Sequence, residues 1–234
     1  MTSATEIIAH DSNTTTTNTI VNNTQDDDKD NVGRKRPKTI KKEKNKKVEQ
    51  HILKSSYFGN DNSLANDNDN DDSFIEIGID EAGRGPMFGR VYIGAVVLPK
   101  DSKQFDFSKM KDSKKFHSDK KIKEAAEYIK SHAIAWSVIY AEHDEIDEKN
   151  IRKATIDCMH KAVNDIMEKM NQTPDKLYLL VDGNDFIPMM KLCDDSYIQI
   201  PHKCIESGDN TYASIAAASI LAKVTRDEYI IEMC

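Results

Sequence analysis

Long apolar segments are missing from this chain of 234 residues. The longest apolar runs, at 91–98 and 213–222, contain 8 and 10 residues, whereas a membrane-spanning helix requires roughly 20. The first residues lack a basic region followed by an apolar stretch, so we expect no secretory signal. These absences argue against an integral membrane protein and lead us to expect an intracellular protein with no membrane partner.

Cysteine is also scarce. The four cysteines are 35, 11 and 30 residues apart, which fits neither a zinc-binding pattern nor a dense disulfide framework. We therefore expect reduced, structural thiols. With 38% hydrophobic and 31% charged residues, the chain has room for one globular domain and an appendage. We expect this protein to be a monomer.

The appendage is residues 1–73, which hold 11 of the 16 asparagines and only two aromatic residues. A segment this poor in apolar side chains cannot offset the entropy lost on ordering, so we expect it to be disordered. Within it, residues 34–47 carry nine Lys or Arg and one Glu. This basic block is either a solvated tail or a nuclear-import or nucleic-acid-binding segment. The expected location is cytoplasmic, or nuclear if the block acts as an import signal.

Residues 74–234 show the periodicities of regular structure. Alternating or continuous apolar patterns predict strands, and apolar residues three and four apart predict helices. The expected strands are 74–79, 91–98, 133–141, 176–181 and 197–200, and the expected helices are 121–132, 150–170 and 213–231. This order predicts an α/β fold in which a mixed sheet is covered by helices.

Acidic residues follow several of these elements. Asp80 and Glu81 stand where the first strand gives way to a glycine-rich turn, and Asp182 directly follows the apolar strand 176–181. Asp209 precedes the last helix, where it could instead be an ordinary helix cap. Each acid alone also fits a solvated turn. Together they suit a cluster held by a divalent cation, and oxygen ligands favour Mg²⁺ or Mn²⁺ over zinc.

Six short strings carry a family resemblance. They are Gly-Ile-Asp-Glu-Ala-Gly-Arg-Gly-Pro at 78–86, Asp-Ser-Lys-Lys at 112–115, Asn-Ile-Arg-Lys-Ala-Thr at 150–155, Val-Asp-Gly at 181–183, Gly-Asp at 208–209 and Ser-Ile-Ala-Ala-Ala-Ser-Ile-Leu-Ala-Lys-Val-Thr-Arg-Asp at 214–227. In order and spacing, residues 74–234 resemble type 2 ribonuclease H, the ribonuclease HII family. The resemblance implies a ribonuclease H-like mixed β-sheet flanked by helices.

The resemblance also implies a function. Its implied catalytic and metal-binding acids are Asp80, Glu81, Asp182 and Asp209. The implied enzyme is a metal-dependent endoribonuclease that hydrolyses the RNA strand of RNA/DNA hybrids and cuts 5′ of ribonucleotides embedded in duplex DNA. Two-metal-ion catalysis would leave 5′-phosphate and 3′-hydroxyl ends.

Four further residues have implied roles in substrate binding. The loop Gly83, Arg84 and Gly85 is similar to the family's sensor of the ribose 2′-hydroxyl, the group that distinguishes RNA from DNA. Lys114 would contact a phosphate, although a solvated loop lysine is an equal interpretation.

Two departures from the family pattern keep an alternative open. Ser207 stands where the family usually has a lysine, and the chain stops at Cys234. We expect it to lack the family's C-terminal helical segment, which carries a tyrosine that stacks on the sugar beside the cut. The alternative is therefore a nucleic-acid-binding protein of the same fold with an impaired active site.

Overall fold

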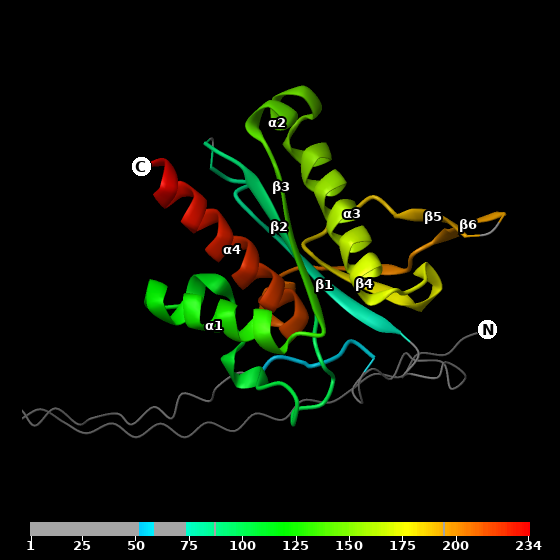
Figure 1. The fold of residues 1–234 in the computed structure, drawn as a ribbon, viewed down its shortest axis with the longest axis horizontal. Coiled ribbons are helices and arrows are strands. Elements are labelled where there is room, and N and C mark those ends of the chain that lie inside the picture. The colour runs from blue at the N-terminus through cyan, green and yellow to red at the C-terminus, as the bar shows by residue number, and fades with distance from the viewer. Residues whose placement is uncertain (1–51, 59–73, 87, 194) are drawn as a thin grey trace, which may run out of the picture. The chain divides into compact units, whose positions relative to one another are not determined.

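The structure, a computed structural model, describes residues 52–58, 74–86, 88–193 and 195–234 (Figure 1). The strands are β1 (Ile75–Ala82), β2 (Val91–Val97), β3 (Ala135–Ala141), β4 (Leu177–Asp182), β5 (Met190–Cys193), β6 (Ser196–Gln199) and β7 (His202–Ile205). The α-helices are α1 (Asp119–His132), α2 (His143–Lys149), α3 (Ile151–Met170) and α4 (Ala213–Met233). Four 3₁₀ helices lie between them, η1 (Phe107–Lys109), η2 (Ser113–Lys115), η3 (Pro174–Lys176) and η4 (Gly208–Asn210). None of the helices in these described ranges is long and apolar enough to cross a membrane.

Five strands form the main sheet, in the order β3-β2-β1-β4-β7. β1 and β3 both run antiparallel to β2, whereas β1, β4 and β7 run parallel to one another. The sheet is therefore mixed, and the predicted α/β fold is confirmed. Parallel neighbours end at the same edge, so β1 and β4 bring their carboxyl ends together there.

Helices cover both faces of the sheet (Figure 1). Ile79 and Ile93 belong to the core cluster that includes Ile166 of α3, whereas Val96 belongs to the cluster that includes α1 and Ala217 of α4. This separation follows from the strand geometry, in which successive side chains point to opposite faces.

The long helix α3 follows local sequence signals. The side chain of Asn150 accepts the N–H of Lys153 at 3.0 Å and caps the start of the helix. Asn171 adopts the left-handed conformation that commonly ends a helix. The apolar residues between them recur at helical spacing and face the sheet, which confirms the helix predicted over residues 150–170.

Helix α4 lies unusually close to β1 and β2, because two facing strand positions have no side chain. A Cβ atom at Gly78 would lie 2.2 Å from the carbonyl carbon of Ser214. At Gly94 it would lie 2.2 Å from the carbonyl oxygen of Ala218. Only glycine fits both positions. This approach carries Ser219 up to the end of β1, where Asp80 lies.

The structure differs from the prediction at the far edge of the sheet. The strand expected at 197–200 exists as β6, but it pairs with β5 in a separate two-stranded hairpin. The fifth strand of the main sheet is β7, which was not predicted. Its four residues mix apolar and polar side chains, so their pattern is too short to indicate a strand. The helix α2 was also not predicted.

Residues 52–58, which we call the strap, correct the prediction that the whole of residues 1–73 is disordered. Leu53 is buried in the cluster that includes α4, and Lys54 forms a parallel bridge with Tyr212. Tyr57 stacks on Tyr178 of β4. The expectation failed because the average composition of the segment hides a short apolar stretch. The rest of the predicted tail, including the basic block, lies outside the described residues.

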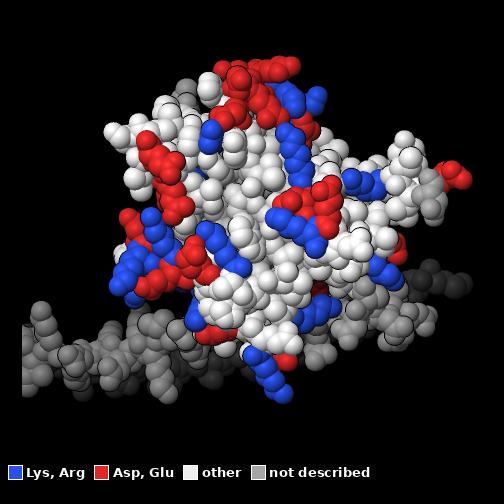
Figure 2. Space-filling view, in the orientation of Figure 1, with Lys and Arg blue, Asp and Glu red and all other residues white. Residues whose placement is uncertain are grey.

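Charge is distributed unevenly over the domain. On the face seen in Figure 2, acidic side chains gather over α2, whose sequence is His-Asp-Glu-Ile-Asp-Glu-Lys. Elsewhere on this face Lys and Arg are interleaved with Asp and Glu. The four cysteines are free, as expected, and Cys158 is buried.

Candidate active site

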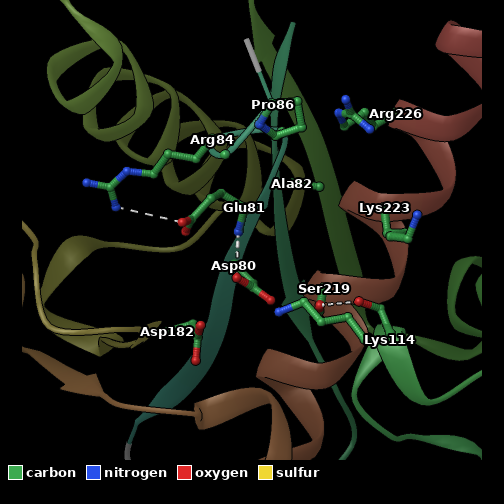
Figure 3. A pocket seen from close by; sticks show the side chains of 13 residues that line it. Asp80, Glu81, Ala82, Arg84, Pro86, Lys114, Asp182, Ser219, Lys223 and Arg226 are labelled. Carbon is green, nitrogen blue, oxygen red and sulfur yellow. Dashed lines mark hydrogen bonds and ion pairs between the residues drawn. The ribbon is translucent and has the colours of Figure 1, made fainter. Parts of the chain in front are cut away.

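The first two acids meet because their strands are parallel neighbours. Ile79 of β1 pairs with Val181 of β4, so Asp80 and Asp182 occupy adjacent positions at the same edge of the sheet. Figure 3 shows both carboxylates beside the same cavity. Each aspartate ends a run of apolar core residues, which fixes its backbone against the core.

A cavity of about 380 Å³ opens at this edge. Seven of the eight site residues predicted from the sequence line it, namely Asp80, Glu81, Gly83, Arg84, Gly85, Lys114 and Asp182. They come from β1, the loop after it, η2 and the end of β4. The structure thus gathers residues that are more than 100 positions apart in the sequence.

The loop after β1 turns sharply at Gly83, whose φ of +101° is strained for any other residue. A Cβ atom there would also lie 2.6 Å from the carbonyl oxygen of Arg90. The guanidinium of Arg84 lies 3.7 Å from Glu81 and 3.7 Å from Asp185. Asp185 in turn makes a two-pronged contact with Arg152 of α3, at 2.7 Å for each pair of atoms. This network holds the arginine beside the acids.

The eighth predicted residue, Asp209, does not line this cavity. It sits on η4, is 6% exposed, and accepts a hydrogen bond from the Asn210 side chain at 3.0 Å. Burial raises the pKa of Asp209, and the negative charges of Asp112 and Asp182 raise it further. Asp209 is therefore close enough to Asp182 to feel its charge.

The carboxylates at the cavity repel one another. Burial raises the pKa of Asp80 well above its usual value, and the negative charges of Asp182 and Glu81 raise it further. Burial also raises the pKa of Glu81, with Arg84 opposing the shift and Asp182 adding to it. A cation placed between these groups would relieve the repulsion.

The donor set suits a hard divalent cation, because every candidate ligand is a carboxylate oxygen. Among the described residues, however, no three His, Cys, Asp or Glu side chains are gathered closely enough to hold one ion. The aspartates accept N–H groups instead: Glu81 donates its backbone N–H to Asp80 at 2.7 Å, and Gly208 donates to Asp182 at 2.7 Å. Three of these acids would thus have to move closer together to bind one ion.

Helix α4 supplies cavity residues that sequence reasoning missed. Ser219, Lys223 and Arg226 line the cavity beside Ser113. The hydroxyls of Ser113 and Ser219 lie 2.9 Å apart, and a hydrogen bond from Ser219 partly offsets the raised pKa of Asp80. The three α4 residues are spaced by four and three, so they share one helical face. That spacing was the signal that could have identified them.

Lys114 projects from η2, where its backbone N–H is bound by Asp112 at 2.9 Å. Its side chain lines the cavity, and Figure 3 shows it directed toward Asp80. Its positive charge also counteracts part of the rise in the pKa of Asp209. The lysine thus faces the acids, although its side chain is exposed.

Comparisons with known proteins show what this chain is similar to. The sequence profile described as Ribonuclease HII matches residues 77–234. Ribonuclease HII of Parabacteroides distasonis is 44% identical over 159 residues, which cover 68% of this chain and 71% of that protein. Ribonuclease HII of Neisseria meningitidis serogroup A is 41% identical over 153 residues, which cover 65% of this chain and 70% of that protein.

Solved structures share the fold at lower identity. Ribonuclease H2 from Pyrococcus horikoshii OT3 superposes with a TM-score of 0.55 at 24% identity, covering 68% of this chain and 74% of that one. Bst-RNase HIII, solved in complex with Mn²⁺, gives a TM-score of 0.54 at 20% identity, covering 69% of this chain and 54% of that one. The profile match and the curated relatives together show that this chain belongs to the ribonuclease HII family of metal-dependent endoribonucleases, which act on RNA/DNA hybrids.

Proposed function

We propose that this chain hydrolyses the RNA strand of RNA/DNA hybrids and also cuts 5′ of single ribonucleotides embedded in duplex DNA, leaving 5′-phosphate and 3′-hydroxyl ends. The observation that carries the proposal is one cavity lined by three acids, the loop Gly83–Arg84–Gly85 and a lysine. Family membership supports the hybrid as a substrate.

The proposed ligands for Mg²⁺ or Mn²⁺ are Asp80, Glu81, Asp182 and Asp209. Their oxygen-only chemistry supports this choice. Burial raises the pKa of Asp80 and of Glu81, and the charge of Asp182 raises both further, so a cation bound among these acids would relieve their repulsion. A pair of bound divalent ions would supply an activated water and would stabilise the departing 3′ oxygen.

The protein's own contribution is to hold the nucleic acid in place. The loop Gly83–Arg84–Gly85 lines the cavity, where its backbone groups would read a ribose 2′-hydroxyl. A Cβ atom at Gly85 would meet nothing within 4 Å, so the loop has open space for a substrate. Lys114, with Lys223 and Arg226 from α4, places positive charge where phosphates would lie.

The test uses the full chain, Mg²⁺ and three duplexes of the same sequence: all-DNA, DNA with one ribonucleotide, and an RNA strand paired with DNA. We expect cleavage of the last two and none of the all-DNA duplex. Mapping of the products should place the cut 5′ of the ribonucleotide. If both RNA-containing duplexes are bound but stay intact, the proposal falls and a binding protein with an impaired site is the better description.

A further inference from the structure

The strap pairs with the segment that follows Asp209. The backbone N–H of Lys54 donates to the carbonyl of Thr211 at 2.8 Å, and the N–H of Ala213 donates to the carbonyl of Lys54 at 2.9 Å. Thr211 lies two residues after Asp209, and Ala213 is the first residue of α4. An N–H group in the first turn of a helix has no partner within the helix. The strap therefore fixes the point at which η4 passes into α4.

The strap is also anchored to β1. The carboxylate of Glu76, which is 8% exposed, accepts the hydroxyl of Ser56 and the N–H groups of Tyr57 at 2.8 Å and Phe58 at 3.4 Å. A buried carboxylate is costly unless donors surround it, so these contacts tie the strap and β1 together. Glu76 precedes Asp80 by four residues on the same strand and therefore points to the same face of the sheet.

A third contact reaches β4. The ring of Tyr57 stacks on that of Tyr178, with centroids 5.4 Å apart and planes inclined by 18°. It also contacts the ring of Tyr212 at 5.8 Å. Tyr178 precedes Asp182 by four residues on β4. The strap thus contacts all three elements that carry the aspartates, within four residues of each.

We propose that the strap is a positioning element, which holds η4 against β1 and β4 and thereby sets the affinity of the aspartate cluster for a divalent cation. The inference rests on the proposed function in so far as these acids bind the cation. The match to the ribonuclease HII profile begins at residue 77, so the strap lies outside the matched region. It is a feature of this chain that the profile does not include.

The test compares two variants of the full chain. Lys54→Pro removes the N–H that donates to Thr211, whereas Lys54→Ala keeps both backbone groups and changes only an exposed side chain. Mn²⁺ binding is measured by calorimetry without nucleic acid, and binding by the Asp182→Asn variant is subtracted as background. After this subtraction, we expect Lys54→Pro to lower the Mn²⁺ affinity about tenfold. Removing groups that orient metal ligands lowers metal affinity by about 10- to 100-fold, and this expectation is at the lower end of that range. Lys54→Ala should bind as the unaltered chain does.

A second readout separates positioning from general instability. At saturating Mg²⁺, Lys54→Pro should cleave the hybrid at the rate of the unaltered chain, because its acids are all present. If Lys54→Pro does not melt cooperatively, Ser56→Ala replaces it, since this change removes one donor to Glu76 and leaves the backbone intact. Ser56→Ala should also weaken Mn²⁺ binding, by a smaller factor.

Unchanged Mn²⁺ affinity in a folded Lys54→Pro or Ser56→Ala protein would overturn the inference, as would equal weakening in Lys54→Ala. The proposed function fails separately, if the unaltered chain binds Mn²⁺ but leaves RNA-containing duplexes uncut. Mn²⁺ affinity would still report on the strap in that case, because it is measured without substrate.

Discussion

The carboxylate of Asp182 is held by a backbone N–H group and acts electrostatically on the neighbouring acids. It accepts the N–H of Gly208 at 2.7 Å, yet its negative charge contributes to the raised pKa of Asp80. An asparagine could still accept the N–H of Gly208 but would remove one negative charge. The residue therefore illustrates how an active site can carry strain that a cation would relieve.

We predict how Asp182→Asn changes the melting temperature, the stabilisation by Mg²⁺ and the cleavage of hybrids. The melting temperature without divalent ions should be unchanged or higher, because like-charge repulsion is reduced. The rise in melting temperature on adding Mg²⁺ should be lost, and hybrid cleavage should fall about 100-fold or more. Calorimetry with and without Mg²⁺ checks the first two results. The control is Asp195→Asn, an exposed acid in the turn between β5 and β6, which should behave as the unaltered chain. A Mg²⁺-dependent rise that persists in Asp182→Asn would remove this residue from the site.

Helix α4 packs closely against the sheet. Its first half is rich in Ala and Ser and is buried, and the strand glycines beneath it leave no room for a side chain. The same helix delivers Ser219, Lys223 and Arg226 to the cavity. Packing of α4 against the sheet therefore affects both stability and the shape of the site.

We predict that Gly94→Ala destabilises the protein. The new methyl group would lie 2.2 Å from the carbonyl oxygen of Ala218, a backbone atom that cannot move without moving α4. The free energy of unfolding should fall by about 1–3 kcal/mol or more, as for overpacked cores. Urea denaturation measures the change. Gly85→Ala is the matched control, because its Cβ would meet nothing within 4 Å. Equal stability of Gly94→Ala and the unaltered chain would show that α4 can shift outward at little cost.

The whole molecule has a negative net charge, although its substrate is a negatively charged nucleic acid. The formal net charge is −7, and acidic side chains gather over α2 on the face seen in Figure 2. Binding to phosphates nevertheless requires cations, and the sequence concentrates nine of its 33 Lys and Arg at 34–47. This block lies before the strap and before the region that matches the family.

We predict that replacing the nine basic residues at 34–47 with Gln weakens hybrid binding and flattens its dependence on salt. Each lost phosphate contact should reduce the slope of log K against log salt by about 0.9. Binding titrations from low to physiological salt measure this slope. The melting temperature should stay the same, because the core residues of the described ranges begin with Leu53 of the strap. An unchanged slope would mean that the block is a solvated tail.

Local patterns in the sequence determined most of the secondary structure, several site residues and the family. Apolar periodicity identified four strands of the main sheet and three helices. In these elements, buried side chains recur along consecutive residues with the period of a strand or of a helix. Acidic residues at strand ends indicated Asp80, Glu81 and Asp182, which do share one cavity. The short strings identified the family, and the profile match confirmed it.

Tertiary structure alone decided the contacts between residues that are far apart in the sequence. The strand β6 was predicted, but its pairing with β5 instead of the main sheet depends on how the edge is packed. Lys54 and Tyr212 form a bridge across 158 residues, and no local pattern in either segment encodes that partner. The strap is ordered because Glu76 accepts the backbone N–H of Tyr57 and the ring of Tyr178 stacks on that of Tyr57. The folded domain brings these partners together, so the order of the strap depends on tertiary structure.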